Sequence, residues 1–295
     1  MPYTFLLVCG VLSALAYTLM QLLFKHGRAY RGNPLALTAW LGLLAPVWGG
    51  LLWLGLHQKL LVLVASPAYF GWAALWAAMA TVTMALIISL IQRLSLTELT
   101  AYRKAFAAGI AMLADVLWLH IAFEPLTLAA IALILLASVW LSTAPAGRGR
   151  QVGPKDLAVS LLLVFMLAAG LTGQLYVYQQ ALLLQPDVLS HVVFVKMLMA
   201  VFSLGFWLLP SVRKHGQPAG WPLMLAIIGC YVVASFTEGY ALQGLPVTLV
   251  VVTSFVAAAC FTSHDLVTRD LPATRRTLVA LLAVFGGFAL LALGG

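Results

Sequence analysis

The sequence predicts an all-α integral membrane protein with ten transmembrane helices, arranged as two inverted five-helix repeats around a central cavity. Composition is the first reason: 63% of the 295 residues are hydrophobic and 8% are charged, whereas a soluble domain carries about 25% charged residues. The second reason is the spacing of apolar stretches of about 20 residues, the length that a helix needs to cross a bilayer. The third is an internal repetition of sequence features.

Ten apolar segments divide nearly the whole chain. They cover 3–24, 34–56, 68–92, 96–119, 125–143, 157–182, 189–210, 221–243, 247–263 and 277–294. The first begins without a preceding basic residue and is longer than a signal-peptide core, so we expect it to be retained as a span. The expected repeats are 1–143 and 157–295, joined by a Gly-, Pro- and Arg-rich linker at 144–156.

Three sequence echoes relate the two halves. Leu94-Ser95-Leu96-Thr97-Glu98-Leu99 resembles Leu245-Pro246-Val247-Thr248-Leu249, Asn33-Pro34 matches Gln185-Pro186, and Tyr17 with Gln21 matches Tyr176 with Gln180. An odd number of spans in each repeat means that the second repeat inserts upside down, an architecture found in secondary transporters.

The loop cations lie almost entirely on one side of the predicted membrane. Twelve follow odd-numbered spans: Lys25, Arg28, Arg31, Arg93, Arg148, Arg150, Lys155, Arg213, Lys214, Arg269, Arg275 and Arg276. Lys59 alone lies on the other side. Basic loops remain cytoplasmic, so the sequence predicts a multi-pass protein of the cell membrane, the inner membrane of a bacterium, with both termini outside. The net charge of +8 therefore indicates membrane topology rather than nucleic-acid binding.

Ionisable residues inside the spans are the leading candidates for function, because each costs roughly 2.5–3.5 kcal/mol at mid-membrane. Arg103 and Lys104 lie about two turns into the fourth span. One interpretation is a cationic surface for an anionic ligand; the other is that both side chains reach back to the interface. Asp115, on the same stripe of that helix, is expected with His120 at the opposite rim.

Lys196 lies in the middle of the seventh span and Glu238 in the eighth. Antiparallel neighbouring helices would bring them together as a buried pair. Two interpretations stay open: a structural salt bridge, or a pair linked to substrate or to a proton.

Polar stripes on three spans predict a lined cavity. They comprise Ser13, Tyr17 and Gln21; Thr172, Tyr176, Gln179 and Gln180; and Tyr231, Ser235 and Glu238. Small-molecule pockets combine apolar walls with a few polar groups. Hydrogen bonding between helices is the alternative role for each residue.

Sequence motifs of catalysis are missing. The chain has no His-Glu-x-x-His, phosphate-loop or Gly-x-Ser-x-Gly motif, and Asp265 and Asp270 form no aspartate pair. The cysteines Cys9, Cys230 and Cys260 are far apart in the sequence and form no metal motif. We therefore expect neither an enzyme nor a bound cofactor or metal.

An acidic residue precedes the last span of each half: Glu124 in Ala122-Phe123-Glu124-Pro125-Leu126-Thr127 and Asp270 in Arg269-Asp270-Leu271-Pro272. With two five-helix halves, the chain resembles the EamA group of the drug/metabolite transporter superfamily. The resemblance implies a cavity formed chiefly by spans 1, 3, 4, 6, 8 and 9, and transport of small metabolites, often amino acids and often outward. It also implies cytoplasmic termini, opposite to the charge distribution.

These observations together predict a secondary active transporter, an exporter, for a small carboxylate-bearing metabolite. Arg103 and Lys104 would attract the carboxylate, and Glu238 would bind an amino group or a proton. The full set of predicted substrate-binding residues is Tyr17, Gln21, Arg103, Lys104, Tyr176, Gln180, Lys196, Ser235 and Glu238. The alternatives are a carrier of cationic drug-like or lipid-precursor compounds and, in a different class, a membrane-embedded enzyme. Expected partners are the substrate and the lipid bilayer, without nucleic acid. Proton coupling is open, as is the choice between monomer and homodimer.

Overall fold

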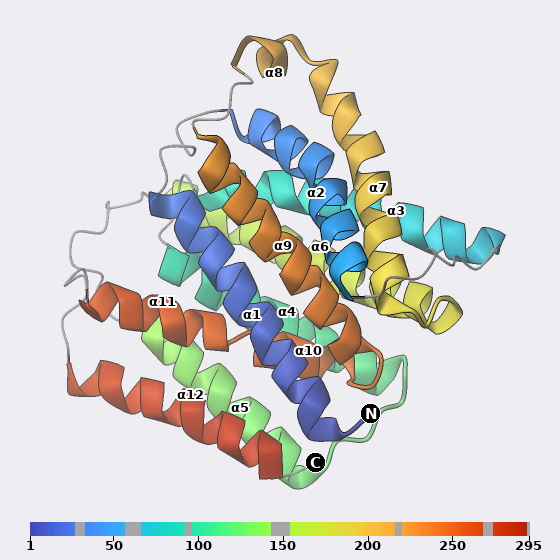
Figure 1. Cartoon of the computed structure of the whole chain (residues 1–295). Coiled ribbons are helices and arrows are strands. Elements are labelled where there is room, and N and C mark those ends of the chain that lie inside the picture. The colour runs from blue at the N-terminus through green and yellow to red at the C-terminus, as the bar shows by residue number, and fades with distance from the viewer. Residues whose placement is uncertain are drawn as a thin grey trace. The chain divides into compact units, whose positions relative to one another are not determined.

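All regular secondary structure in the described part of the chain is helical (Figure 1). The computed structural model describes residues 1–26, 33–56, 66–91, 96–142, 154–215, 220–267 and 274–293. The helices are α1 (Tyr3–His26), α2 (Pro34–Leu56), α3 (Pro67–Ile91), α4 (Leu96–Leu117), α5 (Pro125–Ser142), α6 (Pro154–Leu184), α7 (Val188–Trp207), α8 (Pro210–His215), α9 (Trp221–Leu242), α10 (Val247–Thr253), α11 (Val256–Val267) and α12 (Arg275–Leu293).

Seven of these helices are long and apolar enough to cross a membrane: α1, α2, α3, α6, α7, α9 and α12. The protein is therefore a multi-pass membrane protein, as the composition predicts. Helix α5 is apolar but shorter, and α4 carries the charged residues Glu98, Arg103, Lys104 and Asp115. In the described part of the chain, nine of the ten segments predicted as spans each form one helix and the ninth segment forms two, with ends within a few residues of the expected positions.

The ninth predicted span, 247–263, is interrupted rather than continuous. Helix α10 ends at Thr253, and α11 begins at Val256. The amides of Ser254 and Phe255 donate to carbonyls three residues back, at 3.1 and 2.9 Å, and the Ser254 hydroxyl donates to the carbonyl of Val251. Hydroxyls that bond to preceding carbonyls tighten and bend a helix, which explains the break.

The chain forms two compact units, and each contains segments from both halves of the sequence. Unit 1 comprises Met1–Leu15, Leu94–Thr172 and Gly244–Gly295; unit 2 comprises Ala16–Arg93 and Gly173–Gln243. Helices α1 and α6 contribute residues to both units. The compact units are therefore not the predicted repeats, 1–143 and 157–295.

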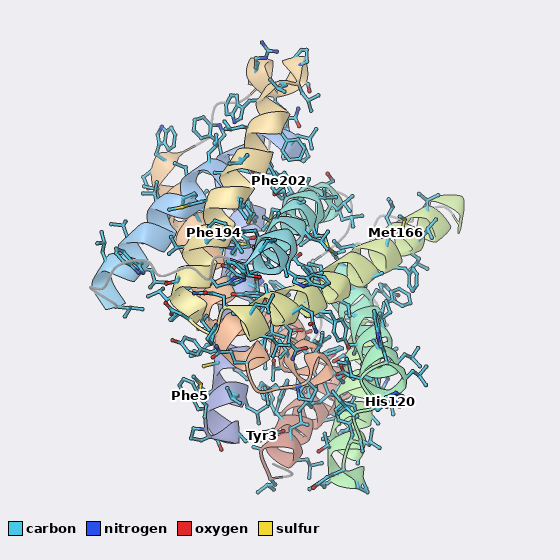
Figure 2. All side chains as sticks on the ribbon, turned by 90° about the vertical axis from the view of Figure 1, so that its right-hand side faces the viewer. Tyr3, Phe5, His120, Met166, Phe194 and Phe202 are labelled. Carbon is cyan, nitrogen blue, oxygen red and sulfur yellow. The ribbon has the colours of Figure 1, made fainter. Side chains whose placement is uncertain are left out.

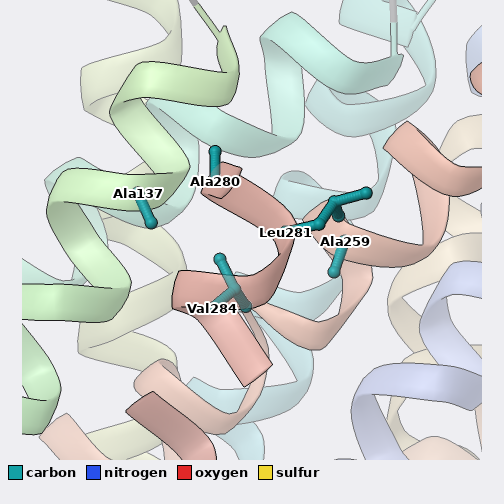
Figure 3. Packing of buried hydrophobic residues seen from close by; sticks show 5 residues of the cluster. All are labelled: Ala137, Ala259, Ala280, Leu281 and Val284. Atoms are coloured by element: carbon teal, nitrogen blue, oxygen red, sulfur yellow. The ribbon is translucent and has the colours of Figure 1, made fainter. Parts of the chain in front are cut away.

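In unit 1, α5 and α12 lie side by side (Figure 1). Small residues allow α5, α11 and α12 to approach closely. Their side chains form a cluster of Ala137, Ala259, Ala280, Leu281 and Val284 (Figure 3). Close packing of small residues is typical of helices in lipid, where dispersion contacts replace the hydrophobic driving force.

Replacing Gly287 with alanine should destabilise this packing. A Cβ at Gly287 would collide with Cγ1 of Ile134 on α5 and lie 3.2 Å from the carbonyl oxygen of Ala130. Overpacking of this kind costs about 1–3 kcal/mol, so the melting temperature of the purified protein should fall. Gly286 is a matched control because a Cβ added there would meet no atom within 4 Å. Gly286→Ala should be neutral or stabilising through its higher helix propensity. Equal melting temperatures for the two variants would contradict the proposed α5–α12 packing.

In unit 2, α7 is the central helix, in contact with α2, α3 and α9. Ten of its residues are buried, among them Lys196 and His191. Other side chains of this helix point outward: Phe202 is 40% exposed (Figure 2). Large exposed apolar residues on a multi-pass protein form the surface that lipid covers. The polar residues buried on α7 therefore stand out as a candidate site.

Candidate functional site

The ammonium group of Lys196 lies fully buried in unit 2, held by neutral partners. Its Nζ donates to the hydroxyl oxygen of Ser235 at 2.7 Å and lies 4.0 Å from the sulfur of Met199. It also lies 3.6 Å from the ring centroid of Tyr231 and 4.9 Å from that of Trp76. We call these four residues, Trp76, Met199, Tyr231 and Ser235, the lysine cage.

The cage offsets a cost of burial of similar size. A cation over an aromatic face gains about 0.5–2 kcal/mol, and a hydrogen bond to a charged group contributes about 1.5–3 kcal/mol. Burial of a lysine at mid-helix in a membrane costs roughly 2.5–3.5 kcal/mol on insertion scales and more in simulations. Because ionisable residues inside membrane spans are rare and mark candidate functional sites, Lys196 is the leading residue of this one.

Glu238 lies near the cage on the same face of α9. Tyr231, Ser235 and Glu238 follow at helical spacing, so that one face carries all three. Glu238 is half-buried and accepts a long hydrogen bond, 3.4 Å, from the hydroxyl of Tyr17 on α1. The Tyr17 ring lies 6.2 Å from that of Tyr231, at a tilt of 54°.

The predicted pair of Lys196 and Glu238 is therefore an indirect one. Glu238 is close enough to interact electrostatically with the ammonium, but the hydrogen bonds of the ammonium go to Ser235 and Met199. The Ser235 hydroxyl in turn donates to the carbonyl of Tyr231 at 3.0 Å, which turns its oxygen toward the lysine. Lysine and glutamate thus share one polar region without a salt bridge between them.

A second layer of aromatic residues supports the cage. The hydroxyl of Tyr178 on α6 donates to the backbone carbonyl of Ser235 at 2.9 Å. The Tyr178 ring stacks on that of His191, with centroids 4.9 Å apart, and lies 5.2 Å from Trp76. The hydroxyl of Tyr69 lies 3.1 Å from Nδ1 of His191. This hydrogen-bonded and stacked layer fixes the positions of the Trp76 and Ser235 groups that contact Lys196.

The sequence did not predict Trp76, Tyr69, Tyr178 or His191. Aromatic residues in apolar segments are usually lipid-facing or interfacial, and a single histidine carries no motif. One signal was present in the sequence: Trp76 and His191 lie inside predicted spans, away from basic loops.

One residue of the polar stripe on α6 bonds to a neighbouring helix, and the lysine cage is formed by residues of other helices. The Gln179 amide donates to the carbonyl of Leu242 on α9 at 3.2 Å, which is the interhelical bonding considered as the alternative. Tyr176 and Gln180 are half-buried, and Gln21 on α1 is buried in the same unit. The cage contacts of Lys196 come instead from α3, α7 and α9.

Arg103 and Lys104 belong to unit 1, on α4. Arg103 is 4% exposed and Lys104 is half-buried. One turn farther along α4, the carbonyl of Ala107 accepts a hydrogen bond from the Thr172 hydroxyl at 3.4 Å. Ser13 is also buried in this unit. The structure thus places the predicted cations Arg103 and Lys104 in one unit and Lys196 with Glu238 in the other.

Asp115 binds a neighbouring helix instead of marking an exposed rim. It is fully buried near the end of α4, and its carboxylate accepts a hydrogen bond from the backbone amide of Thr248 at 2.9 Å. Thr248 lies in the first turn of α10, where amides lack intrahelical acceptors. His120, the other residue expected at the rim, is exposed and has a positive φ of 53° (Figure 2).

Asp115→Ala should therefore destabilise the protein. The substitution leaves the buried amide of Thr248 without this acceptor, at a cost of about 1–3 kcal/mol. The melting temperature should fall clearly, whereas Asp115→Asn, which keeps a carbonyl oxygen, should lose less. A melting temperature unchanged in both variants would show that the carboxylate does not hold α10.

The remaining predicted features contribute no further site. Glu124 is exposed, and its carbonyl accepts from Leu128 at 3.0 Å in the first turn of α5. The three cysteines are free. In the described part of the chain, no group of three or more His, Cys, Asp or Glu residues is placed to hold a metal. Several residues lie outside the described residues: Asp270, Arg28, Arg31, Lys59, Arg93, Arg148, Arg150 and Arg269.

Comparison with known proteins shows the fold and not the function. No family model matches the chain, and no curated protein matches it in sequence. Among 28 matching chains of known structure, one protein solved by crystallography has a TM-score of 0.72 over 98% of this chain and 96% of its own. Its sequence is 17% identical. The protein therefore shares its fold, over nearly its whole length, with a protein of known crystal structure.

Proposed function

We propose that the protein is a secondary active transporter that exports a small carboxylate-bearing metabolite, anionic or zwitterionic, by alternating access. The observation that carries this proposal is the Lys196 ammonium, fully buried in unit 2 among neutral partners. A buried cation without a directly paired anion is suited to bind an anionic ligand, because the ligand supplies the missing charge.

The cage retains unused hydrogen-bond donors. An ammonium has three N–H groups, and the hydrogen bonds to Ser235 and to the sulfur of Met199 use two of them. The indole Nε1 of Trp76 is buried and has no hydrogen-bond partner among the described residues. A carboxylate has two oxygens that would accept from these groups. Glu238 and Tyr17 would receive the amino group of a zwitterionic substrate.

The arrangement of helices supports inverted five-helix repeats as part of this proposal. Helices α2 and α3 contact each other, as do α7 and α9; likewise α4 contacts α5, and α11 contacts α12. The amide of Leu35 donates to the side chain of Asn33 at 2.9 Å at the start of α2, and that of Leu189 donates to Asp187 at 3.3 Å at the start of α7. Equivalent neighbours favour duplication, as does a side-chain cap one residue before each helix, although Asp187 lies two residues after Gln185, the residue that the sequence echo pairs with Asn33.

The interruption between α10 and α11 also favours a transporter, because discontinuous helices are common where secondary transporters bind substrates and ions. We further propose membership of the EamA group and a cell-membrane location with both termini outside. A C-terminal green fluorescent protein fusion tests the orientation: cytoplasmic fluorescence would refute external termini.

Ligand-induced thermal stabilisation tests the proposed substrate class. Amino acids and small carboxylates should raise the melting temperature of the purified protein. Amines and lipid head groups at equal concentration should leave it unchanged. Methyl esters of the effective acids are matched controls, because they remove the negative charge and should have no effect. Stabilisation by amines alone would refute the carboxylate proposal and favour a carrier of cationic compounds.

A further inference from the structure

We infer that Trp76, Tyr231 and Ser235 form an ammonium-binding site that the protein's own Lys196 side chain occupies. While occupied, the site excludes organic cations, so Lys196 acts as the residue that sets the charge of acceptable ligands. Without the lysine side chain, the same site would bind a small alkylammonium ion. The existence of the site does not depend on the proposed transport function. Only the role of Lys196 in selecting substrates rests on that function.

The groups around Nζ are those that recognise ammonium ligands. An aromatic face lies 3.6 Å away on Tyr231 and another 4.9 Å away on Trp76. A hydroxyl oxygen of Ser235 accepts at 2.7 Å. Aromatic cages of this kind bind choline and methylated ammonium groups, and desolvation strengthens them. Trp76, Ser235 and Lys196 are all 0% exposed, and Tyr231 is 2% exposed.

The walls of the site are held by contacts that do not involve the lysine. The Tyr231 hydroxyl donates to the sulfur of Met199 at 3.3 Å. Tyr178 contacts the Trp76 ring and bonds to the carbonyl of Ser235 at 2.9 Å. Removal of the lysine side chain should therefore leave a void, because large side chains fixed by other partners collapse only partly.

The shape of that void specifies a probe. Replacing Lys196 with alanine removes the side-chain atoms from Cγ to Nζ, which are the heavy atoms of n-propylammonium. The probe would thus restore the contacts with Ser235, Tyr231 and Trp76. Glu238, which interacts electrostatically with the native ammonium, would also attract the probe.

The native lysine should exclude the same probe. Two ammonium groups about 4 Å apart repel each other at an effective dielectric constant near 20, and this repulsion lowers the binding constant of the probe roughly a thousandfold. The Lys196→Met variant should also reject the probe, because the methionine side chain fills the void without carrying a charge.

The decisive experiment measures the melting temperature of the purified full-length Lys196→Ala variant in detergent as n-propylammonium chloride is added. We expect a saturable rise with n-propylammonium, at least tenfold stronger in apparent affinity than in the wild type or Lys196→Met. 1-Propanol, of equal size but neutral, should produce no saturable rise. Tyr231→Leu in the Lys196→Ala background should abolish the response, because it removes the nearer aromatic face.

Three results would overturn the inference: equal responses to amine and alcohol, an equal response in the wild type, or a response that survives Tyr231→Leu. If the Lys196→Ala variant is not monodisperse without a ligand, the recovery of monodisperse protein is compared between purifications with and without n-propylammonium. Recovery of monodisperse protein with the amine supports the site, and no recovery refutes it. Failure of carboxylates to stabilise the wild type would refute the proposed substrate class and leave this test unaffected.

Discussion

Replacing Glu238 with glutamine is expected to reduce transport by roughly 10- to 100-fold while leaving the amount of protein in the membrane unchanged. Glu238 interacts electrostatically with Lys196 and accepts a hydrogen bond from Tyr17. Glutamine keeps the size and an acceptor oxygen but removes the charge that would bind the substrate amino group. Hydrogen bonds to charged groups contribute about 1.5–3 kcal/mol, which corresponds to this range of rates. Uptake of labelled substrate into inverted vesicles measures the loss.

The chain offers a matched control for this substitution. Glu124 is an exposed carboxylate in unit 1, outside the cage, and Glu124→Gln should transport at the wild-type rate. Tyr17→Phe removes only the 3.4 Å hydrogen bond to Glu238, so its loss should be smaller than that of Glu238→Gln. Full transport by Glu238→Gln, or an equal loss in Glu124→Gln, would remove Glu238 from the site.

The helices were predictable because bilayer thickness fixes their length, and apolar stretches of that length are visible in the sequence. The predicted segment 34–56 is α2, with the same bounds. The break between α10 and α11 was not predictable from hydropathy. It depends on hydroxyls of Thr253 and Ser254 that bond to preceding carbonyls, and the same residues occur in continuous helices elsewhere, as Thr81 does in α3.

The charged residues of the candidate site could be predicted from the sequence, but the residues that surround the lysine could not. A lysine and a glutamate inside apolar segments are costly wherever they lie, so Lys196 and Glu238 could be selected without a structure. The partners of the lysine could not, because Trp76 comes from α3 and Ser235 from α9, far apart in sequence. Tertiary contacts decide which of the nine Trp residues face a cation and which face lipid.

Lys196→Met is expected to abolish transport and at the same time to stabilise the protein. Methionine is unbranched, has nearly the length of lysine without its charge, and makes favourable contacts with aromatic rings, here those of Trp76 and Tyr231. Replacing buried ion pairs by apolar groups of similar volume is often neutral or stabilising, by about 1–4 kcal/mol in measured cases, and the same relief of desolvation is expected for a single buried ammonium. The direct partners of Lys196 are neutral, and the Ser235 hydroxyl keeps its bond to the carbonyl of Tyr231, so no directly paired charge is stranded.

The opposite signs of these two effects separate a functional lysine from a structural one. A structural lysine would lower the melting temperature when replaced, and any loss of transport would follow from loss of folded protein. A functional lysine is retained at a cost in stability, so its replacement raises the melting temperature and removes transport of carboxylates in the same sample. Melting temperature, membrane abundance and vesicle uptake measured together decide between them. A destabilised variant that still transports at the wild-type rate per folded molecule would show that Lys196 only supports the packing of α7 against α3 and α9.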